Sequence, residues 1–120
     1  MPSMDRAIPP SPPSDLLKAY ECLKNADFAS AERFLEAALH ENYEHEEVLF
    51  ALKSLHFWRE PLLNLDSMKN LVDRGDFLME SWKRYCAFLL HVGGNFETAR
   101  YAFRRAVFGL ALDLYLALPD

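Results

Sequence analysis

The apolar residues of the chain recur at steps of three and four, and the clearest case lies in residues 94–107. Its apolar positions are Phe96, Ala99, Phe103, Ala106 and Val107. Residues at this spacing share one face of an α-helix, so the segment predicts a helix with a buried stripe. No stretch of the sequence alternates over any length as a half-buried strand does. The pattern therefore predicts an all-α protein.

The same pattern occurs a second time, 68 residues earlier in the chain. The earlier copy consists of Ala26, Asp27, Phe28, Ala31, Leu35, Ala38 and Leu39. The separation is twice 34, and a fixed period of about 20 to 50 residues is typical of proteins built from stacked repeats. Alanines at the equivalent places let a neighbouring helix come close.

Both copies resemble the second helix of the tetratricopeptide repeat, a 34-residue unit with a Gly-Asp-Tyr type turn followed by Ala, an aromatic residue and an Ala-Leu pair. The resemblance rests on Ala26-Asp27-Phe28, Ala31, Leu35 and Ala38-Leu39, and on Gly94-Asn95-Phe96, Ala99, Phe103 and Ala106-Val107. The first helix of the unit is matched by Trp82, Tyr85, Cys86 and Leu89, one residue out of phase with the second. The resemblance covers roughly residues 15–110 and implies a right-handed array of about three antiparallel helical hairpins that binds other proteins.

The periodicity and the breaker residues predict the organisation of the chain. Residues 1–14 hold five of the seven prolines and are expected to form an extended or polyproline II tail, with an SH3-type ligand as the alternative. Residues 15–120 form the expected repeat domain. Helices are expected at Asp15–Asn25, Phe28–Glu41, Glu46–Trp58, Pro61–Gly75, Phe77–Val92, Phe96–Val107 and Phe108–Leu118. Ser14 is expected to cap the first helix, Pro61 to begin the fourth and Gly75 to end it.

The charge balance limits the classes of partner. Acidic residues outnumber basic ones by 18 to 13, and the net charge of -5 argues against nucleic acid. Arg100, Arg104 and Arg105 give the sixth helix a basic side, on which Glu97 is expected to compensate Arg100. No apolar run reaches the ~18 residues of a membrane span, and the amino terminus has no signal-peptide pattern. We therefore expect a cytoplasmic protein without a membrane partner.

The sequence offers no support for catalysis. It has neither a phosphate-binding loop nor a nucleophile elbow. Cys22 and Cys86 lack the paired spacing of zinc or redox motifs and are expected to be small buried residues. His40 and His45 stand among glutamates, but a step of five across a helix end does not bring ligands together. We expect no enzyme activity, no cofactor and no metal site.

In the tetratricopeptide-repeat family, the first helix of each hairpin lines a concave binding surface. When the phase of the second helices is extended backwards, the resemblance assigns to this surface Leu16, Tyr20, Phe50, Ser54, Phe57, Arg84, Phe88 and His91. The Lys and Asn pattern with which family members hold a peptide carboxylate is absent. The expected ligand is therefore an apolar helix or extended segment of a partner protein. The alternative is that these rings pack between hairpins.

The carboxyl-terminal segment, residues 108–118, is apolar around most of its circumference, and Asp113 is its only charge. The residues expected to take part in self-association are Leu110, Leu112, Leu114, Tyr115, Leu116 and Leu118. A repeat array normally ends in a helix with a polar face, and burial of each leucine contributes ~1.5 to 3 kcal/mol. We therefore expect the segment to contact a second copy in a homodimer, or to dock where the next helix of a longer chain would lie.

Overall fold

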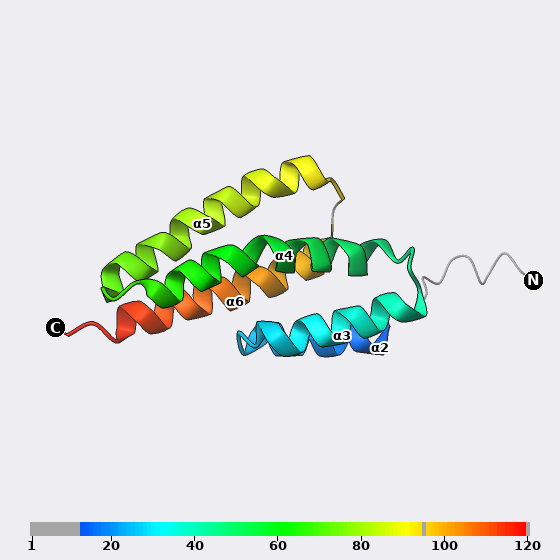
Figure 1. Cartoon of the computed structure of the whole chain (residues 1–120), viewed down its shortest axis with the longest axis horizontal. Helices are drawn as coiled ribbons and strands as arrows, with labels where there is room; N and C mark the ends of the chain where they lie inside the picture. Colours follow the sequence, from blue (N-terminus) through cyan, green and yellow to red (C-terminus); the bar gives the residue numbers. More distant parts are fainter. Residues whose placement is uncertain (1–12, 95, 120) are drawn as a thin grey trace, which may run out of the picture.

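The computed structural model describes residues 13–94 and 96–119, and these form five α-helices and no β-strand (Figure 1). The helices are α2 (Ser14–Lys24), α3 (Phe28–Glu41), α4 (Glu46–Ser67), α5 (Leu71–Val92) and α6 (Glu97–Leu116). The prediction of an all-α protein is confirmed for this part of the chain. The predicted proline-rich tail lies outside the described residues, except for its last two positions.

Local interactions fix several helix ends. The Asp27 carboxylate accepts a hydrogen bond from the Ser30 backbone N–H at 3.1 Å, and the Asn70 side chain accepts one from the Asp73 N–H at 3.1 Å. Each cap satisfies a donor that the first helical turn leaves unpaired. Hydrogen bonding by Ser30 also lowers the pKa of Asp27. Gly93, with φ at 78°, ends α5 in the left-handed region that glycine adopts without strain.

Pro61 does not begin a helix, as the sequence predicted, but lies inside α4. The chain turns at residues 68–70 instead, between α4 and α5. A proline removes one hydrogen bond from the helical ladder, and the helix continues when burial of its neighbours compensates for that loss. Leu55 and Leu65, on either side of Pro61, are only 6% and 5% exposed, so apolar packing holds both parts of α4.

Gly75 does not end a helix either, because it lies inside α5 where the ring of Tyr115 from α6 packs against it. A Cβ atom at Gly75 would be 2.6 Å from Cζ of Tyr115, so a larger residue would displace that ring. α6 continues through the predicted boundary after Val107, which makes the sixth and terminal segments one helix. Ser14 is the first residue of α2 rather than its side-chain cap.

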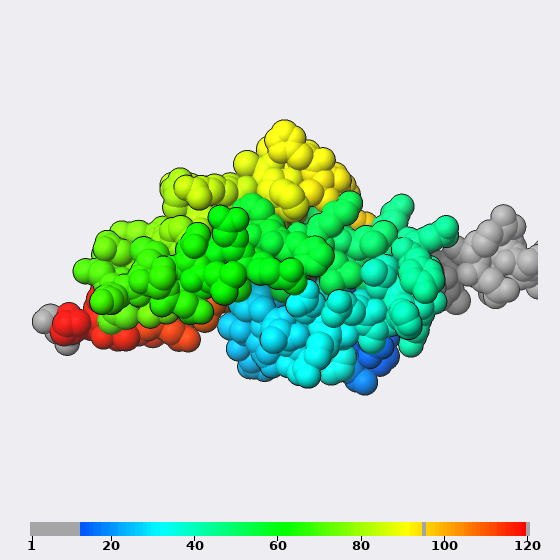
Figure 2. Space-filling model, viewed as in Figure 1, coloured from blue at the N-terminus to red at the C-terminus, as the bar shows by residue number. Residues whose placement is uncertain are grey.

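α2 pairs with α3 and α5 pairs with α6 as antiparallel neighbours, while α4 packs against both α3 and α5 (Figure 1). α2 also packs against α6, so the first hairpin contacts the last helix. In an open array each hairpin contacts only its neighbours in sequence. The α2–α3 pair covers only part of the length of the longer helices (Figure 2).

The two copies of the repeated pattern are buried alike. Their shared positions, each at most 1% exposed, are Ala31, Leu35 and Ala38 in α3 and Ala99, Phe103 and Ala106 in α6. α3 and α6 are also equivalent in position, because each is the second helix of its antiparallel pair. The stripe that the sequence predicted is therefore the buried face of both helices.

The first helices of the two pairs follow a different phase. α2 buries Leu16, Ala19 and Leu23, and α5 buries Leu78, Ser81 and Tyr85. These residues correspond at a separation of 62, not 68. α5 runs on to Val92 after its last buried residue, whereas α2 ends one residue after Leu23, and this difference in length accounts for the shift.

Aromatic rings join α4, α5 and α6. The ring centroids lie 5.4 Å apart for Trp58 and Tyr85, and 5.9 Å apart for Tyr85 and Phe103. The Tyr85 hydroxyl donates a hydrogen bond to Ser54 Oγ at 2.8 Å, and both residues are fully buried. Burial raises the pKa of Tyr85 to about 12, so the hydroxyl remains protonated at neutral pH. This bond sets the distance between α4 and α5.

Candidate binding surfaces

Three of the predicted groove residues are held inside the protein. Leu16 and Phe50 are 0% and 3% exposed, and the Phe50 ring packs against Phe96 with 5.2 Å between the ring centroids. Tyr20 is half-buried, and its hydroxyl donates to the Glu47 carboxylate. Burial raises the pKa of Tyr20, and the hydrogen bond to Glu47 raises it further. These positions connect α2 and α4 to their neighbours instead of lining a groove.

The other predicted groove residues lie along α4 and α5. The Phe57 and Phe88 rings are 5.0 Å apart, each half-buried, while Arg84 and His91 are exposed. Ser54 is buried and bonded to Tyr85. The structure therefore brings Phe57, Arg84 and Phe88 to one side of the molecule. It separates them from the predicted groove residues on α2. The prediction placed α2 and α5 in the same phase, 68 residues apart, whereas their buried residues correspond at a separation of 62.

A cleft of about 340 Å³ opens between α4 and α5, here named the α4–α5 cleft. It is lined by His56, Phe57, Glu60, Pro61, Asn64, Phe77, Ser81 and Arg84. Ser81 is 1% exposed, and its hydroxyl has no hydrogen-bond partner among the described residues. A buried hydroxyl is normally paired, and the unpaired one carries a cost of about 1 to 3 kcal/mol. The cleft thus combines three apolar side chains, those of Phe57, Pro61 and Phe77, with polar side chains and an unpaired hydroxyl.

Sequence reasoning missed Ser81, although one signal was present. Ser81 lies three residues after Leu78 and four before Tyr85, on the buried stripe of α5. A serine at such a position either bonds within the core or faces a cavity. Whether Ser81 bonds within the core or faces a cavity depends on where α4 packs against α5. The spacing of residues on α5 alone does not predict this packing.

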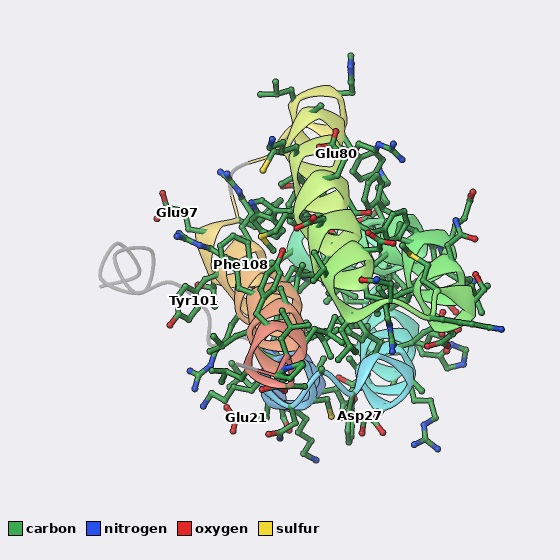
Figure 3. All side chains as sticks on the ribbon, turned by 90° about the vertical axis from the view of Figure 1, so that its left-hand side faces the viewer. Glu21, Asp27, Glu80, Glu97, Tyr101 and Phe108 are labelled. Atoms are coloured by element: carbon green, nitrogen blue, oxygen red, sulfur yellow. The ribbon has the colours of Figure 1, made fainter. Side chains whose placement is uncertain are left out.

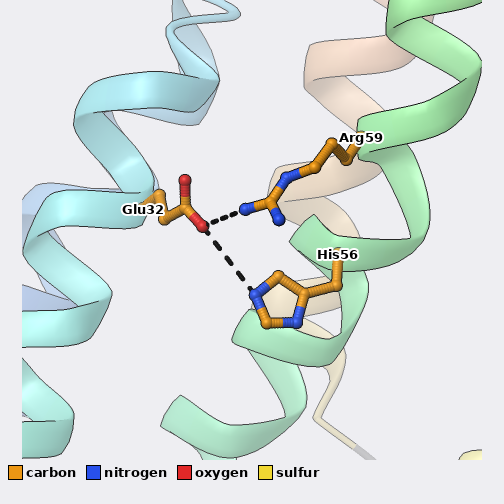
Figure 4. Close-up of polar contacts among 3 residues, drawn as sticks. All are labelled: Glu32, His56 and Arg59. Carbon is orange, nitrogen blue, oxygen red and sulfur yellow. Dashed lines mark hydrogen bonds and ion pairs between the residues drawn. The ribbon is translucent and has the colours of Figure 1, made fainter.

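The charges on the neighbouring part of α4 are paired across to α3 (Figure 4). The Glu32 carboxylate accepts a hydrogen bond from the Arg59 guanidinium, and Nε2 of His56 lies 3.8 Å from the same carboxylate. Arg84, on the other side of the cleft, has no carboxylate within ion-pair distance among the described side chains. Arg84 is therefore the cation that a ligand in the cleft can approach.

The predicted self-association residues divide into two groups. Leu112 and Leu116 are 56% and 73% exposed, and Tyr115 is also exposed. Leu110 and Leu114 are half-buried and pack against the core of the same chain. Leu118, just beyond the end of α6, is half-buried as well. The terminal segment is thus partly covered by its own chain and leaves an apolar row on its outer side.

A second hollow, the α5–α6 groove, has a volume of about 470 Å³. It is lined by Trp82, Cys86, Glu97, Arg100, Tyr101, Arg104 and Phe108. Trp82 meets Phe108 edge to face at 5.2 Å, and the Arg104 guanidinium lies 5.4 Å from the centre of the Phe108 ring. Within the described part of the chain, Arg100 and Arg104 pair with no carboxylate, so the expected compensation by Glu97 does not form an ion pair.

Among the residues that the structure describes, no group of three or more His, Cys, Asp or Glu side chains could hold a metal ion. The helices in the same ranges do not combine the length and apolarity that crossing a membrane requires. Comparison of the chain with protein-family models, curated proteins and solved structures finds no match.

Proposed function

We propose that this protein is a non-catalytic interaction module of tetratricopeptide-repeat type, which binds an apolar helix or extended segment of a partner protein in the α4–α5 cleft. The observation that carries the proposal is the buried, unpaired hydroxyl of Ser81 in a cleft that also presents Phe57, Pro61 and Phe77. A ligand reaches this hydroxyl when the Ser81 side chain rotates toward the cleft, and the hydrogen bond that it then supplies removes the cost of the unpaired group. The compartment that fits this role is the cytoplasm.

The repeat pattern is a second observation that supports the proposal. α3 and α6 bury equivalent residues and occupy equivalent places in their helix pairs. This is the relation expected between units of a repeat protein, whose surfaces serve mainly in binding.

The chemistry of the cleft defines the ligand. Phe57, Pro61 and Phe77 offer contact to one apolar side chain, and Ser81 can donate to or accept from a peptide group. Arg84 can donate to a carboxylate or a backbone carbonyl of the same segment. A partner segment with an apolar anchor and an acceptor one turn away satisfies all of these groups.

The test uses peptides selected from a random-sequence library displayed on phage, with the full chain as the target. The affinity of the best peptide is then measured by fluorescence polarisation. Ser81→Ala and Arg84→Ala should each weaken it about tenfold, because each removes a hydrogen bond to the ligand. Lys53→Ala, an exposed change elsewhere on α4, should leave the affinity unchanged. A selection that returns no peptide, or peptides indifferent to both substitutions, contradicts the proposal.

Self-association is the second candidate function, and the exposure of Leu112 and Leu116 favours it. Large apolar residues in a row on one helix are unusual on a monomer and typical of an interface. Sedimentation of the full chain over a range of concentrations tests this candidate. A chain that remains monomeric at the highest concentration contradicts it.

A further inference from the structure

The outer face of α6 carries a row of large apolar side chains. Tyr101, Phe108 and Leu112 are 61%, 36% and 56% exposed. At about 100° per residue, these three positions fall within about 20° of one direction, opposite the buried Ala99 and Ala106. Tyr101 stands on the outer side of α6 in the view along the helices (Figure 3). α5 covers one side of this row, because the Phe108 ring meets Trp82 at 5.2 Å, and the rest of the row is exposed.

Opposite charges lie at the two ends of this row. Arg100, Arg104 and Arg105 lie in the amino-terminal half of α6, and none of them pairs with a carboxylate among the described side chains. At the other end, the Asp76 carboxylate of α5 accepts a hydrogen bond from the Tyr115 hydroxyl at 2.6 Å. Asp76 is exposed and pairs with no cation within the described ranges. The face is therefore basic at one end and acidic at the other.

The two charged ends are almost equally far from Phe108. Arg100 lies eight residues before Phe108 and Tyr115 lies seven after it, which at about 1.5 Å per residue places them ~12 and ~10 Å away. A two-fold axis that runs beside the exposed face of α6 at the level of Phe108, at right angles to the helix, exchanges these ends. The face is complementary to itself in that arrangement, as a closed symmetric interface requires.

We infer that a second copy of the chain occupies this face, with the two α6 helices antiparallel and Phe108 at the centre of the interface. Arg100 then lies opposite Asp76 of the partner subunit, Tyr101 lies near the partner's Tyr115, and Arg104 lies opposite the partner's Leu112. The inference rests on the self-association proposed above and adds its face and register. In this register residue 100 meets residue 116, the last of α6, so Glu97 lies beyond the end of the partner's helix.

Charge reversal tests the register. Arg100→Glu/Arg104→Glu and, separately, Asp76→Lys place like charges opposite each other in a homodimer, so each variant should dimerise at least tenfold more weakly than the native chain. Mixing the two variants restores opposite charges at both contacts. The mixture should therefore form a heterodimer with a dissociation constant within about threefold of the native value, measured by sedimentation equilibrium.

Matched controls separate the interface from general charge effects. Arg33→Glu/Lys53→Glu makes the same change of net charge at exposed sites on α3 and α4, and should leave dimerisation unchanged. Circular dichroism and thermal unfolding establish that each variant is folded. A native chain that is monomeric throughout overturns both the self-association and this inference. If both charge-reversal variants still dimerise as tightly as the native chain, or if their mixture forms no heterodimer, the face and register proposed here are wrong. Self-association itself is then still supported.

Discussion

Two buried serines on facing helices show how much the surroundings of one hydroxyl matter. Ser54 of α4 accepts a hydrogen bond from Tyr85 at 2.8 Å, whereas the Ser81 hydroxyl of α5 has no partner among the described residues. Both side chains are at most 1% exposed. The first serine completes the core, and the second leaves a polar group unpaired beside a cleft.

The same substitution at these two serines should have effects of opposite sign. Ser54→Ala leaves the Tyr85 hydroxyl unpaired and should lower the free energy of unfolding by about 1 to 3 kcal/mol. Ser81→Ala removes an unpaired hydroxyl and introduces a better helix former, so it should raise that free energy by about 1 kcal/mol. Urea unfolding of both variants measures the two changes. A loss of stability in Ser81→Ala would mean that its hydroxyl is already satisfied in the free protein.

At the scale of the helices, the sequence predicted the buried faces better than the ends. The buried stripes of α3 and α6 follow from local spacing, because residues on one face of a helix are three or four positions apart in the sequence. The ends near Pro61 and Gly75 were predicted wrongly, because each depends on a distant contact. The helix continues through Pro61 because α4 is buried on both sides of it. Position 75 needs glycine because the Tyr115 ring of α6 packs against it.

The candidate site was predictable to a similar extent. Phe57, Arg84 and Phe88 do lie together, because α4 and α5 are neighbours in the chain and pack directly. Leu16 does not join them, since α2 is in register with α5 at a separation of 62 rather than 68. Phe50 of α4 does not join them because it is buried against Phe96. The position of the α5–α6 groove depends on which side of each helix its neighbours leave uncovered. The periodicity of the sequence does not predict that side.

Pro61→Ala tests whether α4 is one continuous helix. Inside a helix, proline is about 3 kcal/mol less favourable than alanine because it lacks a donor and crowds the preceding turn. The substitution should therefore raise the free energy of unfolding by about 1 to 3 kcal/mol, measured by thermal or urea unfolding. If residues 59–61 instead formed a turn between two helices, proline would favour that turn and its removal would lower stability.

At the scale of the whole molecule, the contact between α2 and α6 decides how the chain unfolds. In an open repeat array, a terminal hairpin can unfold while distant units remain intact, because stability is a sum over neighbours. Here the first pair of helices contacts both α4 and α6, so its loss exposes the buried side of the last helix. The described helices should therefore unfold as one cooperative unit.

Leu23→Ala tests this coupling by hydrogen exchange. Leu23 is fully buried in α2, and its truncation should cost about 2 to 5 kcal/mol. If unfolding is cooperative, the amides of α6 lose as much protection as those of α3, because both exchange only through the same global opening. Glu36→Ala, on the exposed side of α3, serves as the control and should leave protection unchanged to within about 0.5 kcal/mol. Loss of protection confined to α2 and α3 would mean that the first pair opens by itself, as the terminal hairpin of an open array does.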